Sequence, residues 1–280
     1  MSFPKKHHFV PEVLLKRFVD SDGWLYAFSK DDPDQKVRKE RPSNVFYAKH
    51  LYSAEGPDGT KDPLLEKEFS KLETAIDPVL NKLADAGVNN QLPALTDQER
   101  LLWHYFFALQ FKRVPDFLHR PEFVDEAASH FREILEEFRQ KYPDRRDELE
   151  TIAGETRRFI KNAQVGALGS VSADVIKVLE SRAITILKLT DPKKAFAIGS
   201  RPVVQLAFGS GKTLHEPSTE MWLPIGNTLL VGVGETGQRE SILFLNDHSA
   251  IRHLNRAVAE QSSHFASCSP ELTRSLAFHR

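Results

Sequence analysis

The segment "TDQERLLWHYFFALQFKRVP", residues 96–115, predicts a buried helix at the centre of the fold. Thr96 can cap its start, and Glu99 three residues later would complete a capping box. Apolar side chains occupy nearly every side of the middle turns, so other elements must surround this helix. Pro115 ends or bends it.

The flanking segments are also helical by pattern. Residues 62–87 carry apolar side chains at steps of three and four, with Pro63 in the first turn and Gly87 at the end. Pro78 is expected to kink or split this helix. Charge and apolar spacing predict further helices, over 121–142, 147–164 and 172–189.

Extended segments lie on both sides of these helices. Near the N-terminus, "GWLYAFSK" (23–30) and "SNVFYAKHLYS" (43–53) are typical of strands. After residue 191, short apolar segments bounded by Gly, Pro and Asn predict a mainly antiparallel sheet, followed by a late helix that starts near Asp247.

The expected fold class is therefore α+β in a single domain, 1–280. Its subdomains would be an N-terminal helix and small β element (1–60), a central helical bundle (61–190) and a β-rich part with the late helix (191–280).

Two glycine motifs resemble nucleotide-binding loops but lack their context. "GSGKT" at 209–213 has Leu206 where a P-loop needs its first glycine, and Pro217 prevents the helix that should follow. "GVGETG" at 232–237 is followed by an apolar strand pattern instead of the helix that a dinucleotide-binding fingerprint needs. We expect a flexible loop and a hairpin, respectively.

Composition excludes some classes of function. A formal net charge of −1 over 280 residues gives no overall basic surface for nucleic acid. The single cysteine, Cys268, excludes an internal disulfide and favours a reducing compartment. Because there is neither a long apolar run nor a secretory signal pattern, we expect a cytoplasmic protein without membrane contact.

The N-terminal segment "KKHHFVPEVLLKRF", residues 5–18, contains the first candidate site residues. Pro11 suits the first turn of a helix that buries Leu14 and Leu15. His7 and His8 precede it in extended backbone, so their side chains point to opposite sides and at most one faces the interior. A neutral histidine there could act as a general base or metal ligand. The alternative is a hydrogen-bonded anchor for the terminus.

Gln110 and Arg113 lie on one face of the central helix, together with Phe106 and Phe117. A buried guanidinium needs a partner, because an unpaired charge is very costly inside a protein. That partner could be an anionic ligand or a structural carboxylate from the preceding helix: Glu66, Glu68 or Glu73.

Further polar candidates lie in the C-terminal part. Ser200 follows the apolar strand "FAI" in "FAIGSRPVV", at a strand end where sites often form. Asn255 lies in the late helix and is a second candidate for substrate binding. For Asn246 and Asp247, at the start of that helix, helix capping is the alternative.

The opening "HHFVPEVLLKRF" and the step "QFKRVP" resemble a bacterial domain-of-unknown-function family, number four-two-three-eight. The segments "FYAKHLYS", "FAIGSRPVV", "MWLPIGNTLLVGV" and "IRHLNRAVAEQSSHF" are similar to it in the same order. After the "FAI" strand the family pattern has Ser-Asp-x-Pro, whereas this chain has Gly199-Ser200-Arg201-Pro202, so the aspartate is missing. The resemblance implies positions of interest but no activity.

Two hypotheses follow, and whether the chain is an enzyme stays open. In the first it is a hydrolase of a phosphodiester or nucleotide, nuclease-like and acting in phage defence. His7 or His8 would serve as acid or base, and the substrate, an anionic small molecule or nucleic acid, would contact Gln110, Arg113, Ser200 and Asn255. A divalent metal is a candidate cofactor. In the second, a regulatory or partner-binding protein uses the same His, Gln and Arg side chains as a buried structural network.

Overall fold

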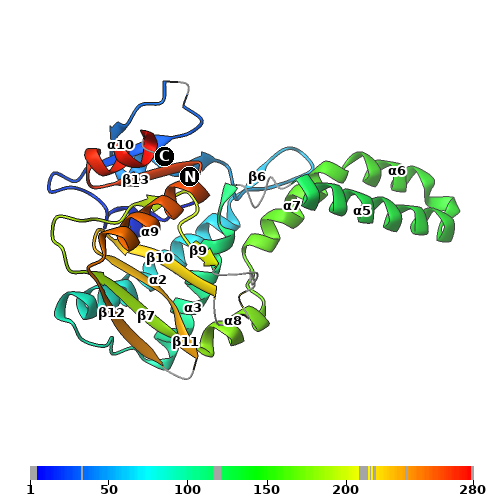
Figure 1. The fold of residues 1–280 in the computed structure, drawn as a ribbon. Coiled ribbons are helices and arrows are strands. Elements are labelled where there is room, and N and C mark those ends of the chain that lie inside the picture. Colours follow the sequence, from blue (N-terminus) through cyan, green and yellow to red (C-terminus); the bar gives the residue numbers. More distant parts are fainter. Residues whose placement is uncertain are drawn as a thin grey trace.

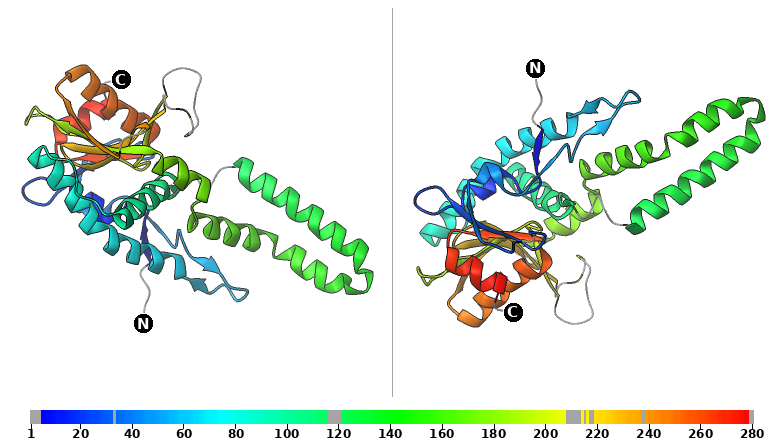
Figure 2. Two further views of the ribbon diagram at one scale, coloured as in Figure 1. Left: turned by 90° about the horizontal axis from the view of Figure 1, so that it is seen from below. Right: turned by 90° about the horizontal axis from the view of Figure 1, so that it is seen from above.

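The computed structural model describes residues 5–32, 34–115, 121–207, 214, 216, 219–236 and 239–278. Phe117 and the "GSGKT" segment lie outside this part of the chain. Figure 1 shows a body of sheets and helices from which a helical arm projects, and Figure 2 shows the same arm in two further views. The fold class is α+β, as the sequence predicts.

The largest sheet has five strands in the order β12-β7-β11-β10-β9. All neighbours pair antiparallel except β12, which runs parallel to β7. This sheet is the mainly antiparallel C-terminal one that the apolar segments predict. Its strands are β7 (Arg182–Leu189), β9 (Val204–Ala207), β10 (Thr219–Gly226), β11 (Leu229–Thr236) and β12 (Glu240–Leu245).

The helix predicted over 172–189 is wrong in its second half. Helix α8 (Ala173–Glu180) ends before Ser181, and the following residues form strand β7. The β-branched side chains of Ile184, Thr185 and Ile186 favour extended backbone. Because β7 is buried on both faces, its apolar residues form a continuous run that does not alternate with polar ones.

Helices cover the two faces of this sheet (Figure 1). Helices α2 (Leu64–Asn89) and α3 (Asp97–Lys112) belong with Ile186 to one core cluster. Helix α9 (His248–Gln261) belongs with Leu187, the next residue of β7, to the other. Successive strand residues point to opposite faces, so β7 lies in the middle of a helix–sheet–helix arrangement.

The predicted start of the central helix is confirmed. The Thr96 side chain accepts a hydrogen bond from the Glu99 backbone N–H, and the Glu99 carboxylate accepts one from the Thr96 N–H. Helix α2 continues through Pro78 without being split and ends at Asn89. Gly87 therefore lies inside the helix, where a Cβ atom would be 2.6 Å from Leu229 Cδ2 of the sheet.

A second sheet joins the two ends of the chain. Its order is β3-β2-β13-β8, so the N-terminal strand β2 pairs with the C-terminal strand β13. These strands are β2 (Leu25–Ser29), β3 (Arg38–Glu40), β8 (Ile198–Gly199) and β13 (His264–Ser267). Helix α10 (Pro270–Phe278) packs against β2 and β13.

Short elements complete the N-terminal part. Strand β1 (Lys6–His8) pairs with β4 (Tyr47–Lys49), and helix α1 (Glu12–Leu15) follows β1. The 3₁₀ turn η1 (Pro42–Asn44) precedes β4. Strands β5 (Ala54–Glu55) and β6 (Lys61–Asp62) form a small hairpin before α2.

The prediction of a hairpin at "GVGETG" is wrong. The prediction that no helix directly follows this motif is confirmed, because strand β12 comes next. Gly232 and Gly234 lie inside β11, and the next strand, β12, pairs with β7 on the far side instead of with β11. Without a helix N-terminus the motif cannot hold a pyrophosphate in the dinucleotide-binding manner.

The central helices divide into two groups. Helices α2, α3 and α8 belong to the body, whereas the next group forms the arm in Figures 1 and 2. The predicted helix over 147–164 is interrupted at Glu155. The arm contains α5 (Pro121–Lys141), η2 (Pro143–Arg145), α6 (Arg146–Gly154) and α7 (Thr156–Leu168). No helix in the described part of the chain has the length and apolar character needed to cross a membrane.

Candidate functional site

Strand β1 places the two adjacent histidines in different surroundings. Its register aligns His7 with Ala48 and His8 with Tyr47 of β4. His7 is fully buried, whereas His8 is partly exposed. The extended backbone thus sends one ring into the interior and the other toward the surface, as the sequence predicts.

The His7 ring is part of the interior. Its Nδ1 accepts a hydrogen bond from the Tyr52 backbone N–H at 3.0 Å, and the two rings stack with centroids 5.8 Å apart. The same nitrogen lies 3.8 Å from Glu66 Oε2. A ring nitrogen that accepts this bond has no lone pair left to take a proton from a substrate. His7 therefore fits the anchoring role better than the catalytic one.

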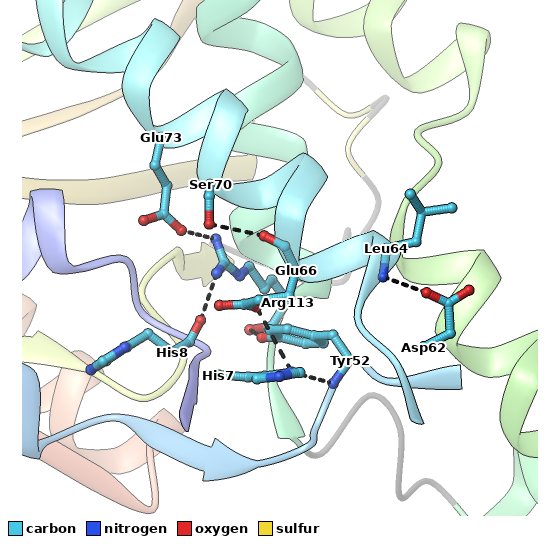
Figure 3. Close-up of polar contacts among 9 residues, drawn as sticks. All are labelled: His7, His8, Tyr52, Asp62, Leu64, Glu66, Ser70, Glu73 and Arg113. Atoms are coloured by element: carbon cyan, nitrogen blue, oxygen red, sulfur yellow. Dashed lines mark hydrogen bonds and ion pairs between the residues drawn. The ribbon is translucent and has the colours of Figure 1, made fainter. Parts of the chain in front are cut away.

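Arg113 holds the N-terminal strand against the helices. It follows the last residue of α3 and is 1% exposed. Its Nη1 donates to Glu73 Oε1 and its Nη2 to the His8 carbonyl oxygen, both at 2.7 Å (Figure 3). The guanidinium also lies 4.2 Å from the centroid of the Phe69 ring. A structural carboxylate, one of the two kinds of partner that the sequence leaves open, is thus provided by Glu73.

Helix α2 supplies the carboxylates that face Arg113. Glu66 and Glu73 are seven residues, or two turns, apart and so lie on one face of the helix. Phe69 lies between them and is buried against the guanidinium. This spacing explains why the second carboxylate, and not the intervening Glu68, reaches the arginine.

Gln110 is also on α3 but takes no visible part in this network. It is fully buried, and neither atom of its amide has a hydrogen-bond partner among the residues that the structure describes. An amide in this state is costly. Among the described residues, the Gln110 amide therefore makes no hydrogen bond to the histidines or Arg113.

The structure places Ser200 and Asn255 elsewhere: Ser200 directly follows strand β8, and Asn255 lies on α9. The Asn255 amide accepts from the Ala197 N–H and donates to the Ala195 carbonyl, both at 2.9 Å. Ser200 Oγ accepts from the backbone N–H groups of Ser263 and His264. Both residues are buried and brace the segment around β8 against α9 and β13.

A separate cavity of about 530 Å³ lies beside Ser200's partners. Ser263 and His264 line it, together with Phe9 from the N-terminal segment and Pro115, which lies three residues after the end of α3. Arg201, which stands where the family pattern has aspartate, donates its backbone N–H to Ser262 Oγ at 3.2 Å. The missing carboxylate would belong to this region and not to the Arg113 network.

His8 opens onto a groove with a volume of about 980 Å³. Its ring points away from Arg113, while its carbonyl oxygen points toward it (Figure 3). The Nε2 atom lies 3.7 Å from Glu12 Oε1 and has no hydrogen-bond partner among the described residues. The groove lining includes carboxylates of Glu12, Glu66 and Glu73 and the cations of Lys6, Lys16 and Arg17.

The surroundings shift the pKa values of two groove residues. Burial lowers the pKa of His8, and the charges of Glu12 and Glu73 partly offset this effect. His8 is therefore neutral at pH 7. Burial raises the pKa of Glu66 to about 7, although the charge of Arg113 acts in the opposite direction. Near neutral pH the groove thus contains a neutral imidazole, that of His8, and a partly protonated carboxyl group, that of Glu66.

The described residues provide no ligand set for the divalent metal that the hydrolase hypothesis includes. Among the described residues, no three His, Cys, Asp or Glu side chains are arranged so that they could hold a metal ion. A divalent cation is usually held by several such oxygen or nitrogen donors. The groove carboxylates are instead engaged with, or close to, Arg113 and the two histidines.

Two residues of this region have no role in the sequence-based hypotheses. Tyr52 contributes a backbone N–H to His7, and no polar pattern in the sequence could reveal a backbone donor. Glu12 lies beside His8 in the groove. Its position in the first turn after Pro11, four residues from His8, is a signal that could have identified it.

The body, with its α-helices on both faces of a mainly antiparallel sheet, defines an α+β protein with an N-terminal strand locked by a buried arginine. The chain belongs to the family described as Protein of unknown function (DUF4238), whose model matches residues 6–271. This confirms the family resemblance of the sequence. No curated protein and no solved structure matches the chain.

Proposed function

We propose that the chain is a hydrolase that acts on a phosphodiester or nucleotide bound in the groove beside His8. The observation that supports this most directly is the position of His8 Nε2. It is a buried ring nitrogen without a hydrogen-bond partner in the described structure, and His8 lines an open groove of about 980 Å³. A neutral imidazole in such a place can accept a proton from a nucleophile.

The other groove residues would take different roles. Lys6 and Lys16 are exposed cations that would attract a phosphate group. Glu66, with a pKa of about 7, would return a proton to the leaving group. Arg113 would be a positioning residue: it is paired with Glu73 and fixes the His8 carbonyl, so it would act through His8 and would not touch the substrate.

The test is a turnover screen with nucleic acids and nucleotides, with and without divalent metals. His8→Ala should abolish turnover while the melting temperature changes little, because the Nε2 atom of His8 makes no hydrogen bond among the described residues. His253→Ala is the matched control, since it removes an exposed histidine from α9. Retained turnover in His8→Ala, or no turnover of the wild type on any substrate, would contradict the proposal.

A biological readout would extend this test to the proposed phage defence. Host cells that express the wild type should resist phage infection, and cells that express His8→Ala should not. Cells that express His253→Ala should resist as the wild type does. Equal protection by the two histidine variants would separate any defence role from the groove chemistry.

The second candidate function is a regulatory or partner-binding protein without catalysis. The burial of His7, Gln110 and Arg113 favours this function, because most of the predicted site residues then lie inside the protein. In that case His7→Ala and Arg113→Ala would lower the melting temperature, and no substrate in the screen would be turned over. Binding to a partner would then be the function to measure.

A further inference from the structure

Helix α5 carries a stripe of exposed side chains along the arm. Glu126, His130, Ile134, Glu137 and Lys141 follow one another at steps of four, four, three and four residues, and all are exposed. Side chains at this spacing lie in line along a helix. The stripe therefore runs the length of the arm on the side that α5 turns to solvent.

The centre of this stripe is apolar. Ile134 is 37% exposed and its neighbour Phe138 is 47% exposed, while Leu135, on the inner side of the helix, is 6% exposed. On α7, Phe159 is 39% exposed, and its ring contacts Phe131 of α5 at 5.7 Å between centroids. The apolar surface thus continues from one helix of the arm to the other. Clustered exposed apolar side chains mark interaction surfaces.

The charged residues at the two ends of the stripe would face residues of opposite character on a second copy of α5 that runs in the opposite direction. If a second α5 lies antiparallel, with the centre between residues 133 and 134, Glu126 is opposite Lys141 of the second copy. His130 is then opposite Glu137 of the second copy, and Ile134 lies beside the two-fold axis, opposite Glu133 of the second copy. Glu126 thus meets a base and Glu137 an imidazole, and the two Ile134 side chains lie one residue apart on either side of the axis.

We propose that two copies of this chain associate through their arms, with the α5 helices antiparallel across a two-fold axis near Ile134. A two-fold contact uses the same surface on both copies, and this stripe has that property. The arm projects from the body in every view, so antiparallel arms carry the two bodies at opposite ends (Figures 1 and 2). The α5 helix has 21 residues. At about 1.5 Å per residue it is long enough for the four helices of two arms to form a bundle.

The first test measures the mass of the full chain by sedimentation equilibrium up to about 100 µM. The wild type should approach twice 31.8 kDa. Ile134→Asp should raise the dissociation constant about 100-fold, because it places two carboxylates together at the apolar centre. Ser129→Asp is the matched control: it adds the same charge to an exposed position of α5 outside the stripe and should leave the constant within about threefold.

The second test reverses the charges at the ends of the stripe. Glu126→Lys should weaken association about tenfold, because a lysine then faces Lys141 of the second copy. The double variant Glu126→Lys/Lys141→Glu restores an acid opposite a base and should return to within about threefold of the wild type. Circular dichroism of each variant verifies that the helices remain folded.

Three results would overturn the proposal. They are a wild type that is monomeric at the highest concentration, an Ile134→Asp variant that associates as well as the wild type, and a charge swap that does not restore association. The first would leave the surface to a different partner. The other two would place the contact between copies on another part of the molecule.

Discussion

The two sides of strand β1 present the same type of side chain in opposite circumstances. On the inner side, His7 is fully buried, and its ring nitrogen is occupied by the Tyr52 N–H. On the outer side, His8 lines an open groove, and its Nε2 has no hydrogen-bond partner in the described structure. The difference arises from strand alternation, which turns neighbouring side chains to opposite sides of β1, while Arg113 holds the strand through the His8 carbonyl.

The largest expected effect comes from removing the arginine that separates the two sides. Arg113→Ala leaves Glu73 and the His8 carbonyl without their donors and opens a cavity beside Phe69. We expect it to destabilise the protein by about 3 kcal/mol, the cost of breaking a buried ion pair from one side. Urea denaturation measures this loss.

Arg132→Ala is the control for this variant, because Arg132 is an exposed arginine on α5. It should change the free energy of unfolding by less than about 0.5 kcal/mol. If Arg113→Ala lowers the free energy of unfolding no more than Arg132→Ala does, the Arg113 contacts contribute little. The burial of the inner side of β1 would then need another explanation.

A second effect concerns pH, through Glu66 on the boundary between the sides. Its folded pKa is about 7, above its ordinary value of 4.5. The folded state therefore binds the proton more tightly, so the contribution of Glu66 to stability is fully present below pH 4.5 and is lost as pH rises through 7. The shift corresponds to at most about 3 kcal/mol. Glu66→Gln should remove this part of the pH dependence.

The measurement is the free energy of unfolding of wild type and Glu66→Gln between about pH 4.5 and about pH 8. The difference between the two curves isolates Glu66. This matters because His8 acts in the opposite sense: its folded pKa is lowered, so its contribution to stability is lost as pH falls. Parallel curves over the whole range would show that Glu66 is not desolvated as the structure indicates.

Local signals made much of the fold predictable. The capping box of Thr96 and Glu99 involves residues within a few positions of one another and is confirmed. The cap of α9 by Asp247, which the sequence offers as the alternative to a site role, is also local and is present. The helix predicted over 172–189 failed because a strand buried on both faces has no alternating pattern. Its identity depends on α2 and α9, which lie far away in the sequence, and a short apolar run alone does not separate helix from strand.

The candidate site was predictable to a smaller extent. The need of Arg113 for a partner follows from its place on an apolar helix, but choosing Glu73 requires knowing how α2 and α3 pack. Ser200 and Asn255 are polar residues near strand and helix ends, which the sequence does not distinguish from site residues. Their side chains satisfy nearby backbone groups instead. Such bracing roles leave no pattern in a single sequence.

The smallest expected effect compares the two histidines directly. His7→Ala leaves the buried Tyr52 N–H without an acceptor, which costs about 2 kcal/mol. The His8 side chain is 12% exposed, and its Nε2 has no hydrogen-bond partner in the described residues, so His8→Ala should cost less than half as much. Thermal unfolding of both variants under the same conditions gives the ratio. Equal losses would mean that both sides of β1 are structural, and the groove beside His8 would lose its main support as a place for catalysis.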